Sequence, residues 1–139
     1  MVDDIPSVGE REFPLPREAH YHGDLTRVFF VVAAVLILLA EFSGADLPFT
    51  ANMSIFMVVL LVVTAGITNP VQWWIQWANV IISAFGLLLF GGIAVSYFRE
   101  GSSFFGNGIF VALLSITFLL ALYFATRTLR AIIILRSFR

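Results

Sequence analysis

The sequence predicts an all-α membrane protein: a bundle of four transmembrane helices with both termini in the cytoplasm. Hydrophobic residues make up 60% of the 139 positions and charged residues only 12%, whereas soluble domains are roughly half apolar and a quarter charged. The apolar residues gather in four blocks, each near the roughly 20 residues that cross the hydrocarbon core. Four spans use most of the chain, so no separate soluble domain is expected.

Turn-forming and polar residues separate the expected elements. Residues 1–23 contain prolines and acidic residues without periodicity, and we expect an irregular acidic cytoplasmic tail. The transmembrane domain is expected over residues 24–125, with helices at about 25–43, 48–68, 70–98 and 104–125. Residues 126–139 continue the helical pattern as a basic, apolar C-terminal extension.

The first two expected helices have recognisable ends. Asp24 is suited to cap the first helix, and Gly44 is suited to the left-handed conformation that ends it. Pro48 favours a first helical turn in the second helix, with Asp46 nearby as a cap. The link between these two helices is therefore short.

The third expected helix begins with aromatic and amide side chains and continues with small residues. Its first third, with Gln72, Gln76 and Asn79 between tryptophans, is typical of a belt at the level of the lipid headgroups. The belt residues are Trp73, Trp74 and Trp77. Small residues further along allow another helix to approach closely, above all at the Gly92–Ser96 spacing. The helix-packing candidates are Gly86, Gly91, Gly92 and Ser96.

The distribution of arginine predicts the orientation. Both tails together carry seven of the eight basic residues, and the links on the opposite side carry only Arg99. By the positive-inside rule both termini are cytoplasmic. Four arginines of the C-terminal segment are candidates for contacts with anionic lipid headgroups or with the acidic N-terminal tail. They are Arg127, Arg130, Arg136 and Arg139.

Glu41 is the candidate ion or proton site. An ionisable side chain at or near the hydrocarbon is costly, and such residues commonly carry function. The last turn of a helix is also unfavourable for a carboxylate, because the helix dipole is negative there. The alternative is a solvated carboxylate at the outer interface, and both interpretations stay open.

The segment around this glutamate, LLAEFSGA, resembles the LAE-x-x-G segment of the small multidrug resistance transporters, which are four-helix dimers of similar size. The resemblance implies that Glu41 would bind substrate and protons alternately. It covers about one and a half helical turns. The long acidic tail and the third helix depart from the pattern of that family.

Other chemistry finds little support in the sequence. Glu18, His20, His22 and Asp24 form an E-x-H-x-H-x-D pattern, but no further histidine could complete a metal site, so we predict no metal and no cofactor. The amides of Asn52, Asn79 and Asn107 lie near expected helix ends, where capping or water satisfies them. Serines and threonines in the spans lack a histidine or lysine partner, which disfavours an enzyme.

The sequence therefore favours a structural or accessory subunit of an oligomer or a larger membrane complex, acting through helix packing and cytoplasmic tails. The alternative is a small oligomeric transporter or channel, coupled to protons or cations through Glu41. The expected partners are the lipid bilayer and other membrane chains or further copies of this one. Nucleic acid is not expected at a net charge of −1. We expect an integral protein of the prokaryotic cytoplasmic membrane.

Overall fold

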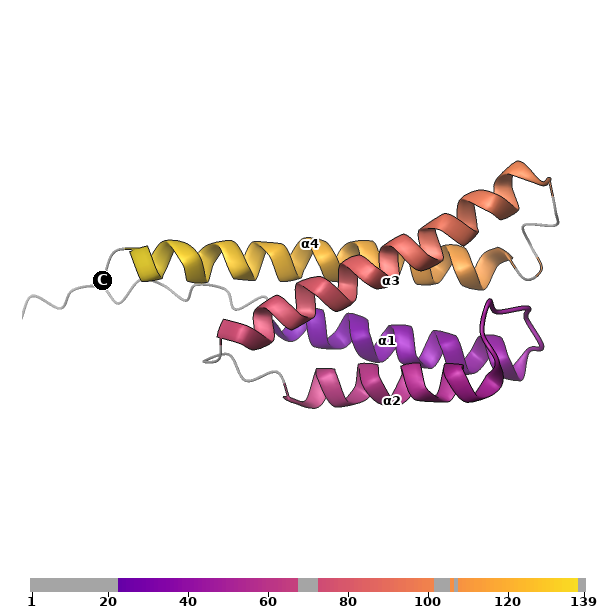
Figure 1. The fold of residues 1–139 in the computed structure, drawn as a ribbon, viewed down its shortest axis with the longest axis horizontal. Helices are drawn as coiled ribbons and strands as arrows, with labels where there is room; N and C mark the ends of the chain where they lie inside the picture. Colours follow the sequence, from indigo (N-terminus) through magenta and orange to yellow (C-terminus); the bar gives the residue numbers. More distant parts are fainter. Residues whose placement is uncertain (1–22, 68–72, 102–105, 107, 138–139) are drawn as a thin grey trace, which may run out of the picture.

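The computed structural model of the chain describes residues 23–67, 73–101, 106 and 108–137, and four helices make up this part of the structure. Their bounds are α1 Gly23–Phe42, α2 Ala51–Ile67, α3 Trp73–Arg99 and α4 Ile109–Ser137. Figure 1 shows them as long antiparallel rods, with the start of α1 and the end of α4 at the same end of the molecule. The prediction of an all-α fold is confirmed.

The end of α1 follows from Gly44, which adopts the expected left-handed conformation with a φ of 69°. The amide of Ala45 donates to the carbonyl of Ala40 at 3.0 Å, and the amide of Gly44 donates to the carbonyl of Glu41 at 3.2 Å. These two bonds form a Schellman motif, which satisfies carbonyls at the end of a helix. The chain then turns back toward α2.

The starts of α1 and α2 differ from the sequence-based expectation. Helix α1 begins at Gly23, so Asp24 lies inside its first turn and not at its N-cap. Helix α2 begins at Ala51 and not at Pro48, because the carbonyl of Thr50 accepts the first helical bonds, from the amides of Met53 and Ser54 at 2.8 and 3.0 Å. Asp46 lies in the link before this helix, and its carbonyl accepts the Tyr97 hydroxyl at 3.5 Å. At the other end of the chain, α4 runs without a break from Ile109 to Ser137 and includes the described part of the C-terminal extension.

Three helices, α1, α3 and α4, are long and apolar enough to cross a membrane. Helix α2 is apolar but has 17 residues, which gives about 25 Å against a hydrocarbon thickness of roughly 30 Å. The structure thus describes three candidate spans and a fourth, shorter apolar helix.

Apolar side chains lie on the surface of this structure as well as in its core. Large apolar side chains are exposed on every helix, for example Val35, Phe56, Leu88 and Ile116. The buried set includes hydroxyl and amide side chains: Thr26, Ser54, Gln76, Asn79, Ser83, Thr117 and Thr128. An apolar surface of this extent is stable only against lipid or other protein, and backbone polar groups inside helices satisfy one another there.

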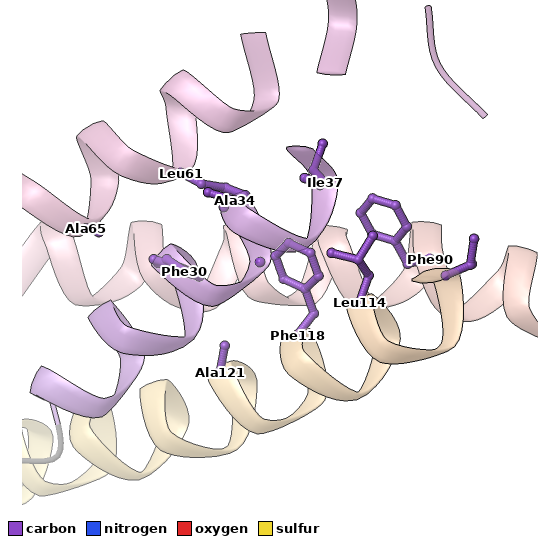
Figure 2. Packing of buried hydrophobic residues seen from close by; sticks show 11 residues of the cluster. Phe30, Ala34, Ile37, Leu61, Ala65, Phe90, Leu114, Phe118 and Ala121 are labelled. Atoms are coloured by element: carbon purple, nitrogen blue, oxygen red, sulfur yellow. The ribbon is translucent and has the colours of Figure 1, made fainter. Parts of the chain in front are cut away.

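The helices pack as a row with three main interfaces, in which α1 contacts α2 and α4, and α4 also contacts α3. Within the described residues α2 and α3 each have one main neighbour, and their other sides are open. One core joins all four helices, with Phe30 and Ile37 from α1, Leu61 from α2 and Phe90 from α3. Figure 2 shows these residues with Leu114, Phe118 and Ala121 of α4.

The middle of the core is closed by stacked aromatic rings. Phe90 and Phe118 stack with centroids 5.6 Å apart and planes at 7°, and Phe49 from the link between α1 and α2 meets Phe90 edge-on. The Phe118 ring lies over Gly86, where an added Cβ would come within 2.5 Å of ring atoms. Glycine at position 86 therefore lets α3 and α4 approach closely. We refer to Gly86, Phe90 and Phe118 as the aromatic plug.

Candidate functional site

Glu41 lies in the last turn of α1 and receives a hydrogen bond from α2. The Ser54 hydroxyl donates to Oε1 of Glu41. Ser54 is 1% exposed and Glu41 is half-buried. The short link after Gly44 makes α1 and α2 antiparallel, so the last turn of one helix lies beside the first turn of the other. This geometry brings together two residues that are 13 positions apart.

The same geometry changes the electrostatics of the carboxylate. The C-terminal end of α1 is unfavourable for negative charge, but Ser54 belongs to the first turn of α2, whose N-terminal end is favourable. Glu41 has no ion pair among the described residues. Two features therefore favour a charge on this residue: the hydrogen bond from the Ser54 hydroxyl and the N-terminal end of α2.

Sequence reasoning identified Glu41 and missed Ser54. The partner depends on the length of the link between the helices, because in an antiparallel pair that length decides which residue of the second helix lies opposite position 41. We had no reason to prefer Ser54 over its neighbours before the start of α2 was known.

A second set of polar groups lies on the buried face of α3. Gln76, Asn79 and Ser83 are spaced by three and four residues, so they share one face of the helix. Their exposures are 1%, 1% and 0%. Nε2 of Gln76, Oδ1 of Asn79 and Oγ of Ser83 have no hydrogen-bond partner within the part of the chain that the structure describes. We refer to these three residues as the polar face of α3.

This arrangement corrects the expectation for the start of the third helix. The tryptophans of the expected belt are exposed, and Trp73 and Trp77 meet edge-to-face at 6.1 Å, but Gln76 and Asn79 face inward. Asn79 lies in the second turn of α3, away from the helix end where capping was expected. The spacing of positions 76, 79, 83, 86 and 90 is the signal that could have found this face. Gln72 and Asn107 lie outside the described residues.

The helix-packing candidates divide into two pairs. Gly86 lies under the Phe118 ring, and a Cβ at Gly91 would meet the Ser115 hydroxyl at 3.4 Å, so both face α4. A Cβ at Gly92 would meet nothing within 4 Å, and the exposed Ser96 donates its hydroxyl to the Gly92 carbonyl. In Figure 1 the last turns of α3 lean away from α4. The Gly92–Ser96 spacing therefore faces outward.

Charged side chains gather at the two ends of the bundle. Arg27, Arg127 and Arg130 lie at the end where α1 starts and α4 finishes, together with Asp24, which pairs with Arg27 at 3.6 Å. The opposite end carries Glu41, Asp46 and Glu100 with Arg99. Arg127 and Arg130 are exposed and line a groove of about 480 Å³ with Tyr123. Arg136 belongs to α4, and Arg139 lies outside the described residues.

The histidine pattern of the N-terminal tail also lies outside the described residues, including Glu18, His20 and His22. Within the residues that the structure does describe, no three acidic or histidine side chains are grouped as a metal site.

Three long apolar helices, together with many large apolar side chains on the surface, indicate an integral membrane protein of the all-α class. Comparison with family models, with curated proteins and with solved structures gives no match. The likeness of the LLAEFSGA segment to the small multidrug resistance transporters rests on that segment alone.

Proposed function

We propose that this protein is a small polytopic subunit that acts in an oligomer or a larger membrane complex through helix packing and its cytoplasmic tails. The observation that carries the proposal is the open row of helices. A closed four-helix bundle gives each helix two neighbours, whereas α2 and α3 each have one main interface among the described residues. Their free sides are apolar and available to other transmembrane helices.

The gap between these two helices supports the same role. An apolar cavity of about 200 Å³ lies among Met57 and Leu61 of α2, Ile82 and Phe85 of α3, and residues of α1 and α4. Close packing is the main source of helix association in lipid, because lipid tails are as apolar as leucine. A helix of another chain that packs between α2 and α3 would gain contacts that this chain leaves unmade.

The proposed topology has four crossings and both termini in the cytoplasm. The bundle end with Arg27, Arg127 and Arg130 has three arginines against one aspartate, and the other end has three carboxylates against Arg99. Arginine-rich ends face the cytoplasm. A bilayer that thins locally, or a tilt of its neighbours, accommodates the shorter α2.

Purification of the full chain from its native membrane in a mild detergent tests the subunit proposal. We expect a particle whose protein mass is a multiple of 15.4 kDa, or one that contains a second protein in fixed ratio. A monomer recovered without any companion would contradict the proposal. Cysteines introduced at each end and labelled from one side of sealed vesicles test the topology, which fails if both ends react from outside.

The hydrogen bond between Ser54 and Glu41 favours one alternative, a proton- or cation-coupled transporter or channel that uses Glu41. The aromatic plug lies between Glu41 and the polar face of α3, so a path past Glu41 would have to run between chains of an oligomer. Flux in liposomes distinguishes the two functions. Proton or cation flux that is lost on Glu41→Gln and kept on Glu100→Gln would favour transport, and absence of flux in the unmodified protein would favour the subunit.

A further inference from the structure

The polar face of α3 lies against a part of α4 that offers it no hydrogen bonds. The contacts of Gly86 with Phe118 and of Gly91 with Ser115 fix the antiparallel register of these helices. Extended toward the start of α3, this register sets Ser83 opposite Ala121 and Asn79 opposite Ala125. It sets Gln76 at the level of Thr128. The two alanines, both 0% exposed, have no polar side-chain atoms.

The Thr128 hydroxyl donates to the carbonyl of Phe124 at 2.9 Å, and Nε2 of Gln76 makes no hydrogen bond to it or to any other described residue. From the other side, the stacking of Phe29 on Phe124 sets Thr26 of α1 near the same turn of α4. The Thr26 hydroxyl is buried and, within the described residues, also lacks a partner. Four unpartnered polar atoms therefore occur in one half of the bundle, from the level of Thr128 to that of Ala121.

Leaving these groups unpaired is costly. Each unsatisfied polar group in an apolar interior costs several kcal/mol, whereas immobilising a bridging water costs roughly 0–2 kcal/mol. Donors and acceptors are both present in this set, and small alanine side chains oppose them. A buried water in a protein makes two to four hydrogen bonds to polar groups of this kind.

We propose that this half of the bundle binds ordered water molecules, held by Gln76, Asn79 and Ser83 of α3 and by Thr26 of α1. The waters end at the aromatic plug, where the Phe90 and Phe118 rings are 0% and 2% exposed and offer no hydrogen bonds. The interior thus has a hydrated half on the side of Thr26 and a dry half beyond the plug. This hydration is a property of the single chain, whatever assembly it joins.

Water-edited solid-state NMR of the full chain in liposomes tests the proposal. Magnetisation from water is expected to reach the Asn79 and Gln76 side-chain amides and the Ser83 side chain early. It should reach Phe90 only late. Ile81, which lies near Ser83 along α3 but is 62% exposed to the surroundings, is the internal control for water at the membrane surface. Transfer to Ser83 must be faster than transfer to Ile81.

Variants make the assignment specific. Ser83→Ala is expected to remove a water partner and to slow transfer to Asn79. Thr117→Ala is the matched control, because the buried Thr117 hydroxyl donates to its own helix at the Leu113 carbonyl, and it should leave transfer to Asn79 unchanged. Equal build-up at Asn79 and Phe90, or at Ser83 and Ile81, would overturn the proposal. So would a direct contact between the Gln76 amide and a protein carbonyl.

Discussion

The two polar regions of this molecule satisfy their side chains in opposite ways. At one end a potentially charged group, Glu41, is half-buried and has a specific partner in Ser54. In the other half of the bundle, neutral amides and hydroxyls are almost completely buried, and among the described residues four of their polar atoms have no partner. The ionisable side chain is only half-buried and has a donor, and the unpartnered groups in the core are all neutral. The aromatic plug separates the two regions.

Placing a carboxylate in the second region, at position 79, should have the largest effect on the free energy of unfolding. Asn79→Asp places a charge at a site that is 1% exposed, and an uncompensated buried charge costs about 3–5 kcal/mol. We expect the free energy of unfolding, measured by titration with a denaturing detergent, to fall by that amount.

Asn52→Asp is the matched control, because Asn52 is exposed in the first turn of α2, where negative charge is favourable by about 0.3–1 kcal/mol. If both variants had equal stability, Asn79 would not be in a low-dielectric interior.

Adding a side chain at Gly86 of the aromatic plug should have the next largest effect on the free energy of unfolding. Gly86→Ala puts a methyl group within 2.5 Å of the Phe118 ring, and overpacking of this kind costs about 1–3 kcal/mol. Gly92→Ala has open space around it and should gain up to about 1 kcal/mol from helix propensity. The same unfolding titration measures both. A stable Gly86→Ala variant would show that α3 and α4 are further apart than described.

Removing the donor to Glu41 should have a smaller effect. Ser54→Ala leaves the carboxylate short of one hydrogen bond, but Glu41 is only half-buried, so we expect a loss of about 1 kcal/mol. The exposed Ser96, whose hydroxyl donates to its own helix, is the control as Ser96→Ala. A double-mutant cycle with Glu41→Gln should give a non-zero coupling energy, and strict additivity would mean that the two side chains do not interact.

Breaking the ion pair at the opposite end should have the smallest effect. Asp24 and Arg27 are 3.6 Å apart, and their side chains are 71% and 36% exposed. An exposed pair of this kind contributes about 0.3–0.5 kcal/mol and is screened by salt. Asp24→Asn should therefore reduce the free energy of unfolding by no more than that at low ionic strength. A larger loss that persists in high salt would assign Asp24 a different role.

Much of the fold could be predicted from the sequence, and the packing faces could not. Long apolar blocks predicted the helices, and Gly44 predicted the end of α1. The start of α2 was misplaced because Pro48 favours a first turn, whereas the helical bonds begin at the Thr50 carbonyl. The inward face of α3 was missed because lipid and protein core are equally apolar, so an outward Ile81 and an inward Phe90 look alike in the sequence.

For a related reason, the sequence predicted one residue of the candidate site and not its partner. Glu41 is conspicuous because a carboxylate near hydrocarbon is rare. Its partner is an ordinary serine, and the amides of α3 are conspicuous only after burial is known. Trp73, Trp74 and Trp77 drew attention to the neighbouring Gln76 and Asn79 as surface groups, but the helical repeat separates the two sets onto different sides.

The sequence alone determined that this chain is helical, apolar and suited to a membrane, because composition and the length of apolar blocks are properties of the linear chain. The tertiary structure decided which neighbours each polar group has. Hydrogen bonds depend on distances between different helices, and only packing sets the register of α1 against α2 and of α3 against α4. That register places a donor beside Glu41 and alanines opposite the polar face of α3.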